Sequence, residues 1–153
     1  MSVFRRPGGI SNGDLYGEKE MNAIVEILLW IWQAPQNIVG LVIRLIYGGY
    51  PLFPLVYKHC VVIQRPNFPG GISLGRTIMV KRVNIDGYKD NPTLWDHEHG
   101  HARQSLYLGP LYLFIVGIPS LLWAWYWKPS RGVSYYSFYT EKWADKLGGV
   151  KRQ

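Results

Sequence analysis

The feature that most constrains this chain is the run Trp-Asp-His-Glu-His-Gly-His-Ala at residues 95–102. Within it, His97, Glu98 and His101 fit the pattern H-E-x-x-H, in which two imidazoles bind zinc and the glutamate is a general base. Residues four apart share one face of an α-helix, so His97 and His101 can bind one ion together. Glu98 lies beside that face, where it can reach a water on the ion but is badly placed to bind the metal.

The residues around this run favour a helix. Asn91 can cap its N-terminus, and Pro92 is tolerated at the first helical position. The pair Gly109-Pro110 supplies a stop. Gly100, inside the helix, costs about 1 kcal/mol relative to Ala, which makes sense if another backbone approaches closely there.

Two other interpretations of the run stay open. The H-E-x-x-H pattern also occurs by chance in proteins that bind no metal. Alternatively the run forms a β-strand, on which His97, His99 and His101 would share one face as a three-histidine site. The Asn-Pro start and the missing β-branched residues favour the helix, on which His99 points away from the metal.

The length of 153 residues suits one domain with one sizeable core. We expect residues 1–20, rich in Gly and polar groups, to form a flexible arm that is not a secretory signal. Residues 21–153 then form a single zincin-like domain. Cys60 is the one cysteine, which excludes an internal disulfide, and we expect it to be buried in a strand.

Charge and aromatic content bear on the partners. The formal net charge is +7, which is typical of proteins that bind nucleic acid or anionic lipid head groups. The basic residues form no run, so we expect no nucleic-acid partner, and a nucleic-acid-associated metalloprotease is only a third hypothesis. The 7 tryptophans and 11 tyrosines favour a membrane–water interface, although such residues also build cores.

The chain contains two apolar segments, residues 24–46 and 106–127, which lie on either side of residues 47–105. The first contains Pro35, which predicts two short helices meeting there. The second has 22 residues without a charge, and as one helix it would be about 33 Å long, enough to cross a bilayer. Residues 117–119, Gly-Ile-Pro, interrupt it. Both segments can contact lipid or pack as core.

A second candidate element follows at residues 140–149. Thr140 can cap a short helix that ends at two glycines, and on that helix Glu141 and Asp145 share one face. A zinc ion bound by two histidines needs a third protein ligand, for which Glu is common. Asp145 can accept a hydrogen bond from a ligand histidine and fix its tautomer. The alternative is a solvated helix with surface carboxylates.

These predictions constrain each other. If residues 106–127 crossed a bilayer once, His101 and Glu141 would lie near opposite faces of the membrane. The chain could return only by threading backbone through lipid, which is not permitted. We therefore expect a helical hairpin bent at residues 117–119, either dipping into a membrane or packed on residues 24–46.

Residues 57–63 and 72–83 each look like one strand, with a turn at residues 67–71 between them. They predict a small antiparallel sheet just before the metal helix. The edge strand of such a sheet can pair with an extended peptide substrate, or the sheet only shelters the helix.

The order His97-Glu98-x-x-His101, then Glu141-x-x-Ala144-Asp145, resembles the gluzincin metallopeptidases. The likeness is nearest to the branch with the CAAX prenyl proteases and the HtpX-like membrane heat-shock proteases, and it covers roughly residues 68–149. It implies a membrane-embedded peptidase. The zinc ligands would be His97, His101 and Glu141, the base Glu98, and the partner of a ligand histidine Asp145.

The residue with which that branch steadies the oxyanion has no obvious match here. By residue type alone, the candidates are Tyr135, Tyr136, Tyr139 and His99.

We predict an α+β fold, with a small antiparallel sheet packed on an H-E-x-x-H helix and flanked by apolar helices. The predicted function is zinc-dependent hydrolysis of a peptide or protein substrate at or near a membrane, with Zn²⁺ as cofactor, lipid as a partner and the active site on the cytoplasmic side. The alternative is a non-catalytic, membrane-associated zinc-binding structural protein. Structural zinc sites use four protein ligands, and only three can be nominated here, which favours catalysis.

Overall fold

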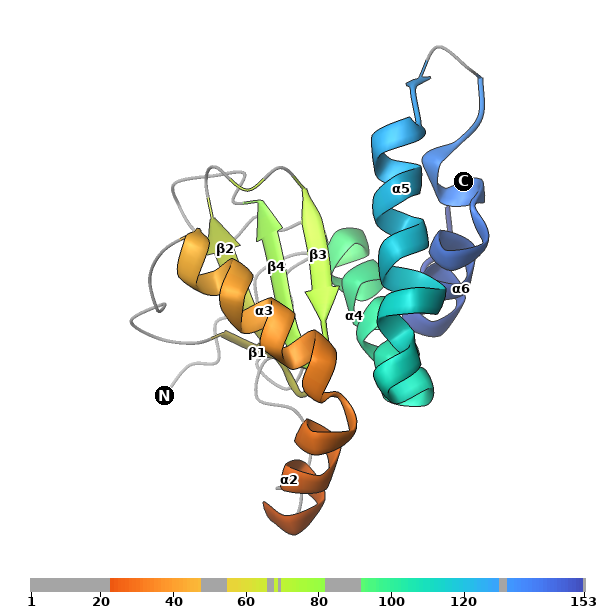
Figure 1. The fold of residues 1–153 in the computed structure, drawn as a ribbon. Helices are drawn as coiled ribbons and strands as arrows, with labels where there is room; N and C mark the ends of the chain where they lie inside the picture. The colour runs from red at the N-terminus through yellow and green to blue at the C-terminus, as the bar shows by residue number, and fades with distance from the viewer. Residues whose placement is uncertain are drawn as a thin grey trace, which may run out of the picture.

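The computed structural model describes residues 23–47, 55–65, 68, 70–81, 92–129 and 132–152. Figure 1 shows a small sheet with helices on both faces, which confirms the predicted α+β class. The expected arm, residues 1–20, lies outside the described residues. Within the described residues the helices are α2 (Ala23–Trp32), α3 (Ala34–Ile46), α4 (Pro92–Leu108), α5 (Ile118–Tyr126) and α6 (Tyr139–Gly148), and the strands are β1 (Leu55–Tyr57), β2 (Cys60–Arg65), β3 (Gly71–Leu74) and β4 (Thr77–Lys81).

Each segment predicted as one strand is instead two strands joined by a tight turn. In the first, Lys58 and His59 turn the chain with φ values of 44° and 68°, and β1 pairs antiparallel with β2. In the second, Gly75 turns with a φ of 61° and joins β3 to β4. Left-handed Lys and His are uncommon, so the first turn carries no sequence pattern that would distinguish it from a strand.

The sheet is mixed, not antiparallel as predicted. Its strand order is β1-β2-β4-β3, and the central strands β2 and β4 pair in parallel. The parallel pair arises because β3 takes the outer edge and carries the chain back before β4 begins. β3 is therefore an edge strand, and it lies beside α4 (Figure 1).

Alternate residues of β4 fill two cores on opposite faces of the sheet. Ile78 packs with Trp95 of α4 on one face, and Cys60 is buried in the same cluster, as expected. Met79 points to the other face, where Ile43 of α3 packs against it. This alternation fits the period of two in a strand, and it places α3 and α4 on opposite faces of the sheet (Figure 1).

The first apolar segment forms two helices, as predicted, but they meet at Gln33 and not at Pro35. Pro35 lies in the first turn of α3, where its missing amide hydrogen is not needed. The two helix axes differ in direction by 85°, and no residue of α2 is buried. Among the described residues no single helix has both the length and the apolar content to cross a bilayer, and α2 with α3 meets those criteria only as a bent pair.

Polar residues at the bend attach α3 to α4. The Gln36 amide donates to Ser105 Oγ at 2.9 Å, and Ser105 Oγ donates to Gln33 Oε1 at 2.8 Å. All three side chains are buried. The polar middle of this apolar segment is thus explained by partners on α4, because buried polar groups need hydrogen bonds.

The prediction that the second apolar segment bends at residues 117–119 is wrong, because the helix continues through these residues and the chain bends at Gly109 instead. α4 ends at Leu108, which confirms the predicted stop, and Gly109 turns with a φ of 51°. A Cβ at Gly109 would collide with the indole ring of Trp32, whose Nε1 donates to the Leu106 carbonyl at 2.8 Å. The turn therefore needs glycine for its φ and for the space that Trp32 occupies.

Beyond a short turn, η1 (Gly109–Leu111), the helix runs without interruption through the proline. A π-helical turn, η2 (Leu113–Gly117), leads directly into α5. Pro119 has no amide hydrogen to donate to the carbonyl of Ile115 four residues earlier. The Tyr139 hydroxyl donates to that carbonyl at 2.6 Å, so the freed acceptor is satisfied from α6.

Candidate metal centre

Two buried imidazoles lie one turn apart on α4. His97 is 3% exposed and His101 is 7% exposed. Their ring centroids are 4.8 Å apart and the ring planes are nearly perpendicular, as expected for residues four apart on a helix. This excludes the strand interpretation of the run.

α6 approaches α4 closely because two glycines leave room for its backbone. A Cβ at Gly100 would collide with the backbone of Ala144, and a Cβ at Gly148 would collide with the carbonyl of Asp96. The close approach expected at Gly100 is thus confirmed. It brings Glu141, which is 1% exposed, to the two histidines.

Three ligand atoms converge between the helices. Glu141 Oε2 lies 3.1 Å from His97 Nε2 and 3.4 Å from His101 Nε2. One ligand atom from each residue lies within 4.8 Å of the other two. Two ligands about 2.1 Å from a tetrahedral ion are about 3.4 Å apart, so these separations suit a metal of the size of zinc. The structure thus brings together the three predicted ligands as a buried group that could bind a metal ion.

The hydrogen-bond partners fix the tautomer of each histidine. His97 Nδ1 lies 2.7 Å from Asp145 Oδ1, a carboxylate that can only accept, so Nδ1 carries the hydrogen. His101 Nδ1 lies 2.7 Å from Gln104 Oε1, while the amide nitrogen of Gln104 donates to the Thr140 carbonyl at 2.8 Å. Nδ1 of His101 therefore also donates. In the neutral rings, both Nε2 lone pairs then point at the Glu141 carboxylate.

Three facing acceptors require a cation between them. Burial would raise the pKa of Glu141, but its hydrogen bonds with His101 and His97 hold that pKa well below its usual value. Burial would likewise lower the pKa of His101, but Glu141 and Glu98 together raise it. A proton on Nε2 or a metal ion can each separate the lone pairs, which is the competition that makes metal binding depend on pH.

Glu98 lies next to this group with one carboxylate oxygen buried and unpaired within the described part of the chain. It is 4% exposed, and its Oε2 has no hydrogen-bond partner among the residues that the structure describes. Burial, the largest cause, raises the pKa of Glu98 above its usual value. The backbone of Gly71 in β3 lies so close that a Cβ there would collide with the carboxylate. Glu98 is thus confined beside the metal group without being one of its ligands.

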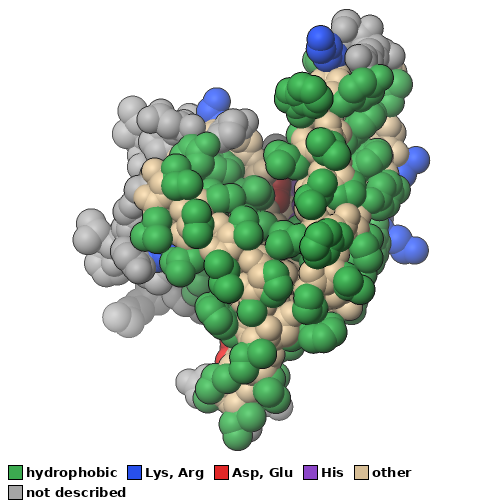
Figure 2. Space-filling model, viewed as in Figure 1, with side chains coloured by type: hydrophobic (Ala, Val, Ile, Leu, Met, Phe, Trp, Pro, Cys, Tyr) green, Lys and Arg blue, Asp and Glu red, His purple; other side chains and the backbone are tan. Residues whose placement is uncertain are grey.

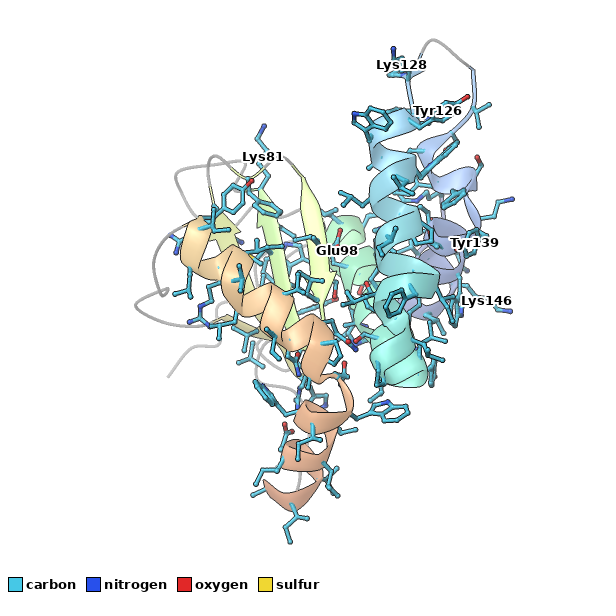
Figure 3. The ribbon with its side chains drawn as sticks, viewed as in Figure 1. Lys81, Glu98, Tyr126, Lys128, Tyr139 and Lys146 are labelled. Atoms are coloured by element: carbon cyan, nitrogen blue, oxygen red, sulfur yellow. The ribbon has the colours of Figure 1, made fainter. Side chains whose placement is uncertain are left out.

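The mouth of the site lies on an apolar face. Figure 2 shows an acidic side chain at the bottom of a hollow in a surface covered by hydrophobic side chains. Figure 3, in the same view, labels Glu98 at that place, between β3 and α5. The hollow therefore leads toward the buried carboxylate from the side of the edge strand.

Glu141 is supported by a chain of hydroxyl groups. Ser120 Oγ on α5 donates to Thr140 Oγ1 at 2.8 Å, and Thr140 Oγ1 lies 3.1 Å from Glu141 Oε1, to which it donates. The prediction that Thr140 caps α6 is wrong, because the helix already begins at Tyr139 and Phe138 occupies the cap position. The buried hydroxyl of Thr140 donates instead to Glu141 Oε1, the oxygen that does not face the two histidines.

No protein-family model matches this chain, and neither the curated protein sequences nor the solved structures contain a match. The chemistry of the site is therefore argued from its own geometry.

The four oxyanion candidates lie in different places. His99 points away, with its ring 6.3 Å from that of Tyr57. The hydroxyl of Tyr139 is used by Ile115, and the ring of Tyr136 packs 5.2 Å from the His97 ring. Burial, and then the charges of Glu141 and Glu98, raise the pKa of Tyr135, so its hydroxyl stays protonated in the field of both charges.

Several residues at the site carried no prediction. Gln104 is three residues after His101 on the same helix face, so helical spacing could have identified it. The hydroxyl of Tyr112, buried near both glutamates, donates to the Ser73 carbonyl of β3 at 3.0 Å. The third is Arg152, which donates to Asp145 from seven residues away. No local pattern indicates these last two contacts.

Proposed function

We propose that this protein is a zinc-dependent metallopeptidase that hydrolyses peptide bonds at or near a membrane. The observation that carries the proposal is the pairing of two groups. Three ligand atoms converge from His97, His101 and Glu141, and beside them the buried carboxylate of Glu98 has an oxygen without a partner in the described chain. The first group suits zinc, and the second suits a general base.

The number of ligands favours catalysis over a structural role. Structural zinc sites are closed by four protein ligands, whereas catalytic sites use three and keep one position open. Among the described residues, the group that could hold a metal has three members. The alternative, a non-catalytic zinc protein, draws support from the burial of all three. It gives no reason to keep a carboxylate such as Glu98 beside the site.

The chain's own residues supply the remaining chemistry. Zinc, when bound, is a Lewis acid that acidifies water and polarises the peptide carbonyl. Glu98 takes a proton from the water that adds to the carbonyl carbon. As the carbon–nitrogen bond breaks, Glu98 gives that proton to the leaving amine. The Tyr135 hydroxyl is the side-chain donor that we assign to the oxyanion.

The edge strand β3 supplies a place for the substrate. Its outer edge faces away from β4, and Gly71 lies directly against Glu98. An extended peptide that pairs with this edge would present its carbonyl groups beside the base. Tyr112 holds Ser73 of the same strand, which keeps the edge in place relative to the metal helix.

The membrane part of the proposal rests on the apolar face. Large hydrophobic side chains of α2, α3 and α5 are largely exposed, among them Ile46 at 73% and Trp125 at 84%. Figure 2 shows hydrophobic side chains gathered over these helices around the hollow that leads to the site. Lys81, Lys128 and Lys146 lie at its margin (Figure 3). An apolar surface bordered by lysines suits a bilayer with anionic head groups.

The test of the peptidase is the variant Glu98→Gln, assayed on unfolded casein and a library of quenched fluorescent peptides. We expect it to keep wild-type zinc content, measured by elemental analysis, and to lose hydrolysis by at least about 100-fold. Glu141→Ala should lose both zinc and activity. His99→Gln, a change on the same helix but away from the site, should keep both. Hydrolysis by Glu98→Gln at the wild-type rate would rule out the proposed base.

The test of the membrane surface is flotation with phosphatidylcholine vesicles, with and without phosphatidylserine. We expect the protein to float with both and more completely with the anionic lipid. A variant with Trp125→Glu and Phe114→Glu, which charges the apolar face, should float less. Protein that stays in the aqueous fraction with both vesicle types would refute the lipid contact.

A further inference from the structure

A second group of contacts lies behind the metal centre, where the chain turns back after α6. Gly149 adopts the left-handed conformation with a φ of 77°, and the Val150 amide donates to the Asp145 carbonyl at 2.9 Å. This is the pattern of a glycine-terminated helix, which reverses the chain at its C-terminus. The reversal directs Arg152 back along α6 to the side chain of Asp145.

Arg152 binds Asp145 with two parallel hydrogen bonds. Its Nε donates to Oδ2 at 2.6 Å, and its Nη2 donates to Oδ1 at 2.8 Å. The planar fork of arginine fits both oxygens of a carboxylate and fixes its plane, which a lysine cannot do. Oδ1, which accepts from Arg152, is also the atom that accepts from His97 Nδ1 at 2.7 Å.

The same guanidinium also contacts a second neighbour of His97. It lies over the ring of Tyr136, 3.1 Å from the ring centroid. The Tyr136 ring in turn packs edge to face on the His97 ring, at 5.2 Å between centroids. His97 is therefore held on one side by a hydrogen bond and on another by an aromatic contact. Arg152 touches both of the residues that hold it.

We propose that Arg152 is a positioning residue of the metal centre. It fixes the Asp145 carboxylate and the Tyr136 ring, and these two hold His97 in the Nδ1–H tautomer with Nε2 directed at the metal position. The inference rests on the proposed function in one respect, that His97 is a metal ligand. It adds that the segment after α6 is part of the site, although Arg152 does not touch the metal position.

The experiment measures zinc affinity of the full-length protein by competition with a chromogenic chelator. Mutating a residue that hydrogen-bonds to a metal ligand typically lowers metal affinity by about 10–100-fold. We expect Arg152→Gln to weaken binding by about 10-fold, and Arg152→Lys to weaken it less because it keeps the charge without the fork. The matched control is Lys151→Gln, which removes the same charge from the adjacent exposed residue and should bind as the wild type does.

A double-mutant cycle distinguishes positioning from general stabilisation. If Arg152 acts through Asp145, then adding Arg152→Gln to an Asp145→Asn variant should change zinc affinity by less than about 2-fold. A full additional 10-fold loss in that background would overturn the proposal. A second measurement needs no metal: nitrogen-15 NMR of His97 in the metal-free protein should show a hydrogen bound to Nδ1 in the wild type, whatever the state of Nε2, and a partial loss of that hydrogen from Nδ1 in Arg152→Gln. A hydrogen fully retained on Nδ1 in both proteins would also overturn it.

Failure of this inference is separable from failure of the peptidase. If the wild type binds zinc but cuts no peptide, the proposed activity falls and the role of Arg152 stands on the affinity and NMR results. If Arg152→Gln binds zinc as tightly as the wild type while Glu98→Gln abolishes hydrolysis, only the role of Arg152 is refuted.

Discussion

The contact between α4 and α6 at Gly100 allows a quantitative prediction. Replacing Gly100 with Ala adds a Cβ that would lie 2.6 Å from the carbonyl carbon of Ala144 and 3.0 Å from its Cα. These are backbone atoms in the middle of α6, so no side-chain rotation can relieve the overlap. α6 must move away from α4 by a distance on the order of 1 Å, since packed interiors have no space to absorb it.

The expected change in the free energy of unfolding combines two opposing effects. Overpacking a core destabilises by about 1–3 kcal/mol, and a rigid backbone neighbour places this site near the upper end. Ala in a helix interior gains about 1 kcal/mol over Gly. The free energy of unfolding should therefore fall by about 2 kcal/mol in Gly100→Ala. Because Glu141 moves with α6, zinc affinity should fall by at least about 10-fold, since a site tolerates only small changes in ligand distance.

The assay is urea denaturation followed by circular dichroism, with zinc affinity measured by chelator competition. Gly117→Ala is the matched control, because its Cβ would make only ordinary van der Waals contacts, with the Leu113 side chain at 3.4 Å and the Tyr112 carbonyl oxygen at 3.9 Å. It should leave zinc affinity unchanged and stability equal or higher. Wild-type stability together with wild-type zinc affinity in Gly100→Ala would refute the close approach of the two helices.

Two further predictions concern other residues. In Gly71→Ala, the new Cβ displaces the Glu98 carboxylate, so hydrolysis should fall by about 100-fold with unchanged zinc content. Gly70→Ala, with open space around its Cβ, should retain activity, and equal rates for the two variants would contradict the contact. Burial raises the pKa of Cys60 to about 12, so about one thiol in 10⁴ is ionised at pH 8 and a disulfide reagent should label it only in urea. Rapid labelling of the folded protein would contradict its burial.

The metal group was predictable because its residues lie on two helices with clear periodicity. His97 and His101 are four apart, and so are Glu141 and Asp145, so each pair needed only the assumption of a helix. Gly100 also carried usable information, since a glycine in a helix interior suggests a close neighbour. The backbone of Ala144 does lie against Gly100, so a residue that is unfavourable in a helix can indicate a contact with another helix.

The sheet and the bend were mispredicted for physical reasons. Period-two alternation continues across a two-residue turn, and Lys58 and His59 do not have the composition of such a turn. Pro119 predicts a bend at residues 117–119 because proline disrupts a helix, but a π-helical turn and the Tyr139 hydroxyl compensate for the proline there. Arg152 could not be found because its contact depends on the chain reversal at Gly149.

The pattern of exposure along α5 and the turn before it bears on the proposed lipid contact. Phe114, Ile118, Leu121 and Trp125 follow helical spacing along one side, and they are 69%, 49%, 68% and 84% exposed. On the opposite side Ser120 faces α6 and donates to Thr140, which is next to Glu141. A helix in water shows the reverse arrangement, with its apolar side buried and its polar side exposed.

Glu141 determines how such a helix can meet lipid. The chain leaves α4 at Leu108 and must be back at α4 by Glu141, whose Oε2 lies within 3.4 Å of Nε2 of both His97 and His101. Backbone cannot thread back through a bilayer without hydrogen-bond partners. α5 can therefore contact lipid only along its outer side, with both of its ends attached to the protein. In the proposed lipid contact, the apolar face would lie against the bilayer as a surface, with the hollow beside Glu98 opening toward it.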